Sequence, residues 1–409
     1  MSVTLWPNAN KPSFKELCSL LYSPTNSIFI SLLNSENKSR LSEGTHIKIC
    51  IVTISLAGGG AERSCAMLSE MLAAQGHEVH IATLNDAVDY PYAGTLFNMG
   101  EFKQGKDHLG KRYRRFKHFR NYLIANSIDM IIDHRPKNQY YRELFYHHYV
   151  YKGLKRIYVT HSSSPALYFT QLPKKFVKLL NRNAANVAVS AYIENEVMKP
   201  LGVRSTRTIH NAFDPRWKEI NNDLPAALAN ASYILSYGRI DEAVKDYSFL
   251  IRAFDHSELW QENIKLVIMG DGPDKGELQK LAKDTAAANN ILFLPHDSAP
   301  FKIIQNARFV TLTSHFEGFP MVLVESLSMG TPVVSLDIVS GPSEIIQHEK
   351  NGLLVPKREV SLFASAMRNM VDNETLYENY RTNARESVEP FLFNKISEKW
   401  NKLIADVTG

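Results

Sequence analysis

The sequence predicts an α/β protein made of two doubly wound, Rossmann-like domains that face a cleft. Short apolar runs rich in β-branched residues alternate with segments of helical apolar spacing, which is typical of βαβ units around a parallel sheet. This alternation pauses in a stretch rich in Pro, Asn and Ala at residues 211–232 and then restarts. The chain has 409 residues, enough for two or three domains of about 150 residues each.

The first block opens with a strand, a turn and a helix. Residues 46–55 form a short apolar run dominated by β-branched side chains, which predicts a buried parallel strand. Three glycines at 58–60 follow, and residues 64–75 have the apolar spacing of a helix that Gly76 ends. Residues 78–84 predict the second strand, which completes one βαβ unit.

The remaining elements define two blocks of similar size. We expect an N-terminal extension of unknown role over residues 1–45, an N-terminal Rossmann-like domain over 46–212 and a C-terminal one over 213–389. The first block continues with strands at 130–133, 156–160 and 186–190 and a helix at 191–201; the second has strands at 233–237, 265–269, 291–294, 309–312 and 332–335, and helices at 247–254 and 275–287.

Composition limits the class of protein. With 44% hydrophobic and 22% charged residues, the chain is an ordinary globular protein, and disordered, collagen-like and disulfide-rich classes are excluded. Three cysteines cannot form a disulfide framework, and no apolar run approaches the ~20 residues of a spanning helix. No basic region precedes an apolar stretch at the N-terminus, so we expect a cytoplasmic protein without a secretory signal. The net charge of +5 is too weak for a nucleic-acid coat.

The glycine-rich turn at 58–60 is the first candidate binding element. Glycines let the backbone approach a ligand closely, and the N-terminus of the following helix favours an anion. The pattern departs from the dinucleotide fingerprint because Glu62 and Arg63 follow, so a phosphate or sugar contact is the better functional interpretation. A turn that carries glycines only for steric reasons is an equally open alternative.

Two cations follow the first strand of the second block. Arg239 comes directly after that strand, and Lys245 precedes the next helix. Arginine binds a diphosphate through two hydrogen bonds and lysine binds it as a point charge. The alternative, for any such pair taken alone, is two solvated surface cations.

The strongest local signal is a pair of carboxylates around a tight turn. Gly318 and Pro320 hold the turn, and a helix begins near Met321. Glu317 precedes that helix and Glu325 lies within it, which would separate them by ~12 Å along a continuous helix. That exceeds the ~5 Å of a retaining glycosidase pair, so we expect the two carboxylates to bind different parts of one ligand. A capping Glu and a surface Glu remain the alternative for each residue singly.

One histidine stands at the carboxyl end of a predicted strand. His161 follows the strand at 156–160 and begins a Ser-rich loop. Ligand contacts gather at this end of the strands in doubly wound sheets. A structural histidine with satisfied hydrogen bonds is the alternative.

These pieces together resemble the retaining glycosyltransferases of the GT-B fold, and specifically family 4, the glycosyltransferase group 1 family. In this family the N-terminal domain binds the acceptor, the C-terminal domain binds the nucleotide-sugar, and the last helix, here within residues 390–409, packs back on the N-terminal domain. The matching residues are 58–63, His161, 187–190, 210–214, Gly238, Arg239, Lys245, 270–273, Glu317, Glu325, 330–334 and 344–355.

The resemblance implies a role for each candidate residue. Glu317 would lie at the donor sugar with His161 against the reacting sugar, as the catalytic pair. Glu325 would hold the ribose hydroxyls, and Arg239 and Lys245 would clamp the diphosphate. The remaining donor-binding positions, through their backbone, would be Gly59, Gly60, Gly318, Phe319, Pro320 and Met321.

The implied activity is retaining transfer of a hexose or N-acetylhexosamine. The donor would be a nucleotide-sugar, commonly a UDP-sugar, and the acceptor a glycan or lipid-linked saccharide in bacterial surface polysaccharide or lipopolysaccharide synthesis. No Asp-x-Asp occurs in the chain, so we expect no metal and no further cofactor; cations and a helix N-terminus would stabilise the leaving diphosphate. A sugar-nucleotide epimerase of the same fold and a non-catalytic GT-B partner subunit stay open as alternatives.

Basic charge is concentrated between Lys103 and Arg120. This segment contains eight Lys and Arg residues and one acidic residue, Asp107. Its aromatic residues recur at helical spacing, which predicts a basic amphipathic helix. Near an anionic leaflet each cation contributes ~1 kcal/mol, so the segment could hold the enzyme peripherally on the inner face of the cytoplasmic membrane. A solvated helix whose aromatics pack on the domain is equally open. Nucleic-acid binding through this segment is disfavoured by the modest net charge.

Overall fold

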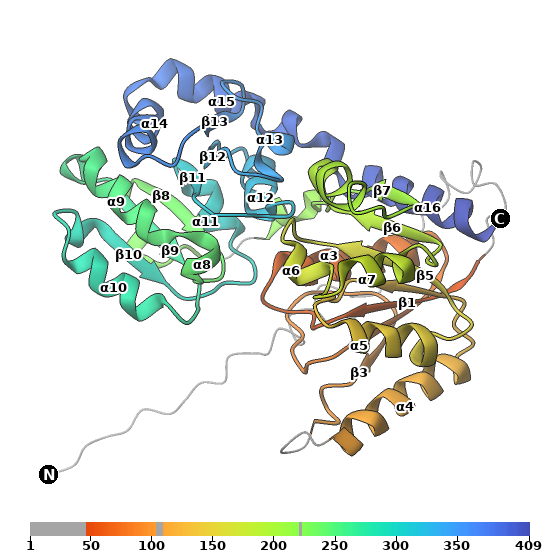
Figure 1. The fold of residues 1–409 in the computed structure, drawn as a ribbon. Coiled ribbons are helices and arrows are strands. Elements are labelled where there is room, and N and C mark those ends of the chain that lie inside the picture. The colour runs from red at the N-terminus through yellow and green to blue at the C-terminus, as the bar shows by residue number, and fades with distance from the viewer. Residues whose placement is uncertain (1–45, 104–108, 221–222) are drawn as a thin grey trace, which may run out of the picture. The chain divides into compact units, whose positions relative to one another are not determined.

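The described part of the chain contains two parallel sheets (Figure 1). The computed structural model describes residues 46–103, 109–220 and 223–409. The predicted extension over residues 1–45 lies outside these residues, as do residues 104–108 of the basic segment. Both sheets belong to one compact unit, His46–Gly409. The α/β fold class predicted from the alternating pattern is confirmed.

The first sheet has seven strands in the order β3-β2-β1-β4-β5-β6-β7, and the second has six in the order β10-β9-β8-β11-β12-β13. The strands of the first are β1 Lys48–Thr53, β2 Glu78–Thr83, β3 Thr95–Asn98, β4 Met130–Asp133, β5 Lys155–Thr160, β6 Ala185–Ala188 and β7 Thr206–Thr208. Those of the second are β8 Tyr233–Tyr237, β9 Lys265–Met269, β10 Ile291–Leu294, β11 Phe309–Leu312, β12 Val333–Leu336 and β13 Gly352–Val355.

The strand order places a switch point in each sheet. In the first, the chain builds outward from β1 through β2 to β3 and then returns to add β4 on the other side of β1. In the second, it builds from β8 through β9 to β10 and returns to add β11 beside β8. Ligands of doubly wound sheets bind beyond the carboxyl ends of the strands at such points. The segments after β1, β4, β8 and β11 are therefore the places to look for a site.

The central strands are buried on both faces, which explains their sequence. In β1, the side chains of Ile49, Ile51 and Val52 are fully buried although they alternate between faces. A strand covered on both sides needs a continuous apolar run rather than an alternating one. One hydrophobic cluster extends from β1 through Val187 of β6 to Leu235 of β8, so apolar packing is continuous between the sheets.

Helices and short helical turns connect the strands. The first sheet is joined by α3 Gly60–Ala74, α4 Leu109–Ala125, α5 Tyr140–Phe145, α6 Pro165–Tyr168 and α7 Pro173–Leu180, two π-helical segments at Tyr146–Val150 and Ile193–Met198, and a 3-10 turn at Pro215–Glu219. The second carries α8 Glu242–Lys245, α9 Tyr247–Ser257, α10 Lys275–Lys283, α11 Phe301–Asn306, α12 Met321–Met329, α13 Pro342–Ile345, α14 Val360–Asp372, α15 Glu374–Ser387 and α16 Phe393–Thr408, with 3-10 turns at Ala226–Leu228, Leu259–Glu262, Ala288–Asn290 and Glu389–Phe391.

The last helix lies against the first block (Figure 1). The side-chain amide of Gln75, at the end of α3, donates to both the carbonyl and the hydroxyl of Ser397 on α16, at 2.7 Å each. Trp400 and Ile404 of α16 are buried. A backbone bridge between Phe213 and Leu392 fixes the point where this helix returns.

Two predicted elements differ from the observed ones. The helix expected over residues 191–201 is mostly the π-helix Ile193–Met198. A π-helix has a wider turn than an α-helix, and the spacing of apolar residues does not distinguish the two. The helix expected over 275–287 ends at Lys283. The strands β3, β7 and β13 were not predicted; β7 has only three residues and β13 begins with Gly352.

The basic segment is helical from Leu109 onward, as its spacing predicted. Phe119 and Leu123 are buried, and the ring of Phe116 lies 5.3 Å from that of Tyr146. Most of the aromatic face therefore packs on the domain, while Tyr113 is half exposed. To solvent the helix offers the cations Arg114 and Lys117 together with Tyr113 and Ile124.

Candidate active site

A cavity of about 260 Å³ lies between the carboxyl ends of the two sheets. Its walls come from the segments after β1, β8 and β11, where the switch points predicted a site, and from the segment after β5. The structure brings every predicted catalytic and donor-binding residue to this one cavity. The lining includes Gly59, Gly60, His161, Arg239, Lys245, Glu317, Gly318, Phe319, Pro320, Met321 and Glu325.

Two helix N-termini border the cavity. Gly59 is the N-cap of α3, and α12 begins at Met321 directly after the tight turn. A Cβ on Gly60 would lie 3.4 Å from the Met321 side chain, so the two helix starts are in near contact. Unpaired N–H groups and the positive end of each helix dipole favour an anion here.

Glu317 and Lys245 form an ion pair inside the cavity. The Lys245 ammonium lies 2.6 Å from the Glu317 carboxylate, and the Ser314 hydroxyl donates to the same oxygen at 2.7 Å. Both side chains are mostly buried, at 17% and 14% exposed. The pair places a cation beside the carboxylate predicted to meet the donor sugar.

Arg239 is the accessible cation of the site. Its side chain is 71% exposed, and its nearest acidic partner, Asp241, is 3.7 Å away. It follows Gly238, whose φ of +139° suits glycine. The guanidinium can therefore reorient towards a ligand with little loss of protein contacts.

Glu325 is held by one residue from each block, Tyr237 of β8 and Arg63 of α3. The Tyr237 hydroxyl donates to its carboxylate at 2.7 Å, and the Arg63 guanidinium lies 3.3 Å away. Arg63 also donates to the Ser298 carbonyl at 2.8 Å. Burial by itself would lower the pKa of Arg63, but the Glu325 carboxylate, together with Tyr90 and Tyr237, raises it. The aromatic rings below this guanidinium are those of Tyr90, Trp217 and Phe301.

His161 is a neutral imidazole at the end of β5. Burial, and then the nearby Lys137 charge, lower its pKa to about 3. Its Nε2 is 2.8 Å from Nδ1 of His134, which follows β4. A neutral ring in this place can accept or donate a hydrogen bond to a sugar hydroxyl, but it supplies no positive charge.

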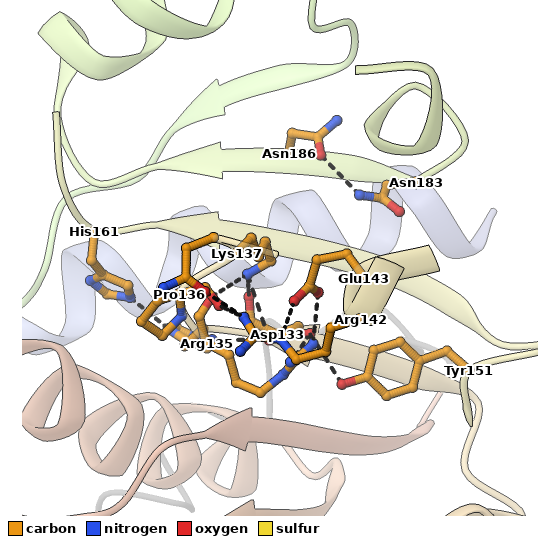
Figure 2. A network of polar contacts seen from close by, with 12 residues as sticks. Asp133, Arg135, Pro136, Lys137, Arg142, Glu143, Tyr151, His161, Asn183 and Asn186 are labelled. Carbon is orange, nitrogen blue, oxygen red and sulfur yellow. Dashed lines mark hydrogen bonds and ion pairs between the residues drawn. The ribbon is translucent and has the colours of Figure 1, made fainter. Parts of the chain in front are cut away.

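A buried network of charges lies beneath His161, at the carboxyl end of β4 (Figure 2). The Arg135 guanidinium is 2.6 Å from Asp133 and 3.1 Å from Glu143, and all three side chains are buried. The Lys137 ammonium donates to the carbonyls of Asp133 and Arg135. Burial lowers the pKa of Lys137 to about 8. The network fixes the loop that carries His134.

That loop in turn supports the loop that follows His161. The Lys137 N–H donates to the Leu167 carbonyl at 2.8 Å, and the Thr170 N–H donates back to Lys137 at 3.1 Å. Sequence reasoning missed the network, although Asp133 is the last residue of a predicted strand. It also gave no role to Arg63, which lies in the quoted glycine-rich motif.

The two halves of the cavity are joined by direct contacts. The Ser163 hydroxyl donates to the Glu317 carbonyl at 2.8 Å. Glu344 accepts from the backbone N–H groups of Ala191 and Tyr192 and pairs with His210 at 2.9 Å. Burial would raise the pKa of Glu344, but these hydrogen bonds, led by that from His210, lower it. We call Glu344 and its partners the interdomain clasp.

Comparison with known families decides the class of protein. Residues 58–217 match the sequence model of Glycosyltransferase Family 4, and residues 223–387 match that of Glycosyl transferases group 1. The chain belongs to the group 1 glycosyltransferases. This glycosyltransferase is therefore an enzyme of the class that the motifs implied, and its two sheets form the GT-B fold.

The glycosyltransferase is similar to named bacterial enzymes over part or most of its length, and to a solved structure over most of it. An N-acetylgalactosaminyltransferase of Campylobacter jejuni, whose name gives a diphospho-undecaprenol-linked acceptor, is 27% identical over 376 residues, 86% of this chain and 97% of the relative. The lipopolysaccharide 1,6-galactosyltransferase of Escherichia coli is 32% identical over 146 residues, 35% of this chain and 40% of its own. The Anabaena protein HepE, crystallised with UDP and glucose, has a TM-score of 0.72 at 19% identity, and the match covers 88% of this chain and 100% of HepE.

Proposed function

We propose that this glycosyltransferase moves a hexose or N-acetylhexosamine from a UDP-sugar to a glycan or lipid-linked saccharide, with retention and without a metal ion. The product would serve bacterial surface polysaccharide or lipopolysaccharide synthesis, at the cytoplasmic side of the membrane. The observation that carries the proposal is that one cavity brings together Arg239 and Lys245, two helix N-termini, the neutral His161, Glu317 and Glu325.

The chemistry follows from where charge develops. Departure of the nucleoside diphosphate builds negative charge, which Arg239, Lys245 and the start of α12 can stabilise without a metal. Glu317 and His161 then face the sugar that loses this group. Glu325 is engaged by Tyr237 and Arg63, so we do not expect it to act as a nucleophile. Attack of the acceptor on the face that the diphosphate leaves would give retention.

The names of the relatives support the substrate classes. HepE was crystallised with UDP, and the Campylobacter and Escherichia coli relatives are named for an undecaprenol-linked acceptor and for lipopolysaccharide. The transferred sugar differs among them, being N-acetylgalactosamine in one and galactose in another. The relatives would differ in this way if they bind the nucleotide through the same residues and select the sugar through residues that differ between them.

The deciding experiment pairs donor binding with transfer. In a thermal-shift panel of UDP-, GDP-, ADP- and dTDP-sugars, we expect only UDP-sugars to raise the melting temperature, because a ligand stabilises the state it binds. Transfer with the stabilising donor is then followed on a lipid-linked saccharide, and NMR of the product gives the anomeric configuration. Stabilisation by a different nucleotide would refute the donor, and an inverted product would refute retention. Epimerisation of the donor without acceptor would favour the epimerase alternative.

Metal independence is tested separately. Within the described ranges, no group of three or more His, Cys, Asp or Glu side chains is arranged to hold a metal ion. We expect transfer to continue at an unchanged rate after dialysis against EDTA. Loss of activity that added magnesium or manganese restores would contradict this part of the proposal.

Replacing Arg239 tests the stabilisation of the leaving diphosphate. A hydrogen bond to a charged group contributes about 1.5–3 kcal/mol, so we expect Arg239→Ala to lower kcat/KM by about 10- to 100-fold. The fold should be unaffected because the side chain is 71% exposed. Arg252→Ala, an exposed arginine on α9, is the matched control and should keep full activity. Near-normal turnover of the Arg239 variant would remove this residue from the mechanism.

Docking of α4 on an anionic membrane is the remaining part of the proposal. Since its apolar face is largely covered, attraction would come from exposed cations such as Arg114 and Lys117. At ~1 kcal/mol each, reversing both charges should weaken binding to phosphatidylglycerol vesicles by about 30-fold or more. The same reversal of Lys280 and Lys283, exposed on α10, serves as the control. No helix among the described residues is both long and apolar enough to cross a bilayer.

If the unaltered enzyme fails to pellet with these vesicles even at low salt, membrane docking through α4 is wrong. Equal loss in the α10 control would show attraction of the whole basic protein rather than of this helix. Binding should fall as salt is added, because exposed charges are screened.

A further inference from the structure

Three histidines and a glutamate lie in series between the candidate active site and the interdomain clasp. His161 Nε2 is 2.8 Å from His134 Nδ1. His210 Nε2 is 2.9 Å from the Glu344 carboxylate. The series is interrupted between His134 and His210, each of which has one nitrogen left over.

Those two nitrogens are buried and have no partner. His134 Nε2 and His210 Nδ1 are shielded from solvent, and neither forms a hydrogen bond with any of the residues that the structure describes. A buried polar atom without a partner costs about 1–3 kcal/mol, so such atoms are usually satisfied by an ordered water molecule. These two nitrogens therefore need partners that the protein itself does not supply.

Both histidines line the same small cavity. Its volume is about 10 Å³, and its other polar walls come from Ser64 and Asn211. About 10–15 Å³ is the space that the centre of a single water molecule needs, and such a water requires two to four polar partners. The cavity therefore has the size and the polar lining for one water, and its remaining walls are largely apolar.

We propose that one buried water joins His134 Nε2 to His210 Nδ1 and completes a hydrogen-bonded chain from His161 to Glu344. His134 and His210 are then positioning residues: neither lies against the reacting sugar, and both hold the imidazole of His161 in its orientation. The proposal rests on the proposed function in one respect, the place of His161 beside the donor sugar. The chain couples that histidine to the clasp that holds the two halves of the site together.

The Glu344 end of the chain determines which nitrogen of His210 carries hydrogen. Glu344 also accepts from the N–H groups of Ala191 and Tyr192, so its carboxylate is the acceptor and His210 Nε2 is the donor. In the neutral imidazole the other nitrogen, Nδ1, must then accept, and the water donates to it. The water can then donate to His134 Nε2, which leaves His134 Nδ1 as the donor to His161, or accept from it, which makes His161 Nε2 the donor to His134.

The water and the tautomers can be tested without any substrate. A crystal structure of the full chain at high resolution should show one water within hydrogen-bond distance of both nitrogens. Nitrogen-15 NMR of the imidazoles should show His210 as the Nε2–H tautomer. A cavity without density, or His210 as the Nδ1–H tautomer, would overturn the chain whatever reaction the enzyme catalyses.

Kinetics tests what the chain does. His134→Asn keeps a polar group near His161 but removes the nitrogen at the cavity, and His210→Phe keeps ring packing on Phe319 and Phe391 but removes both nitrogens. Loss of one buried hydrogen bond should lower kcat by about tenfold in each variant while donor KM changes little. His148→Gln, an exposed histidine, is the control.

The double variant separates a chain from two independent effects. Because both substitutions cut the same chain, we expect the double variant to be no slower than the slower single one. Losses that multiply, or an unchanged kcat in both single variants, would refute the positioning role. If the unaltered enzyme shows no transfer at all, the proposed function fails, while the water and the tautomers still decide the chain.

Discussion

Replacement of Glu317 by glutamine should lower kcat by about 100- to 1,000-fold, the size of loss that follows removal of one preorganised group that stabilises a transition state. In the cavity the carboxylate contacts Lys245 at 2.6 Å and accepts from Ser314 at 2.7 Å. Glutamine keeps the shape and the bond from Ser314 but removes the negative charge beside the donor sugar. The Lys245 ammonium loses its acidic partner and is freed for the diphosphate, so donor KM should stay level or fall.

Steady-state kinetics of UDP release measures both constants. Circular dichroism and the melting temperature establish that the variant folds. Glu277→Gln, an exposed glutamate on α10, makes the same chemical change away from the cavity and should leave kcat untouched. A Glu317→Gln enzyme within a few-fold of normal kcat would show that this carboxylate does not act on the transition state. A large rise in donor KM alone would assign it to binding instead.

Strands could be predicted where burial on both faces demanded a continuous β-branched run. Residues 233–237, 265–269 and 309–312 were located to the residue for this reason. The edge strand β3 has exposed and half-buried residues, and its Thr-Leu-Phe-Asn sequence has no such run. β13 starts with Gly352, whose Cβ would lie 2.3 Å from the Val333 carbonyl, so sheet packing and not strand propensity selects glycine there.

The site could be predicted where a motif follows a strand, because carboxyl ends of parallel strands converge in space. Arg239 after β8 and His161 after β5 were found in this way. Contacts between the two sheets were not predicted. The approach of Arg63 to Glu325 depends on how two blocks pack, which local sequence does not encode. The assigned roles of all these residues stay predictions until variants are measured.

The close approach of the two blocks makes Gly318 the most sensitive backbone position of the site. A Cβ placed on Gly318 would lie 1.9 Å from the His161 carbonyl oxygen and 3.2 Å from the Ser162 nitrogen. Both are backbone atoms of the opposite block, so no side chain can move aside to relieve the clash. The neighbouring bond from the Ser163 hydroxyl to the Glu317 carbonyl, at 2.8 Å, would be stretched as well.

We therefore expect Gly318→Ala to lower kcat by about 100-fold or more, since a displacement of about 1 Å at reacting groups has that effect. Kinetics with the donor identified above measures the loss, and the melting temperature checks that each block still folds. Gly276→Ala at the start of α10 is the matched control, because its Cβ would meet nothing within 4 Å. A Gly318→Ala enzyme with normal kcat would mean that the two blocks work further apart than they lie in this structure. Glu317 and His161 lie on either side of the clash. Normal kcat would therefore also show that their proposed roles do not depend on the close approach seen in this structure.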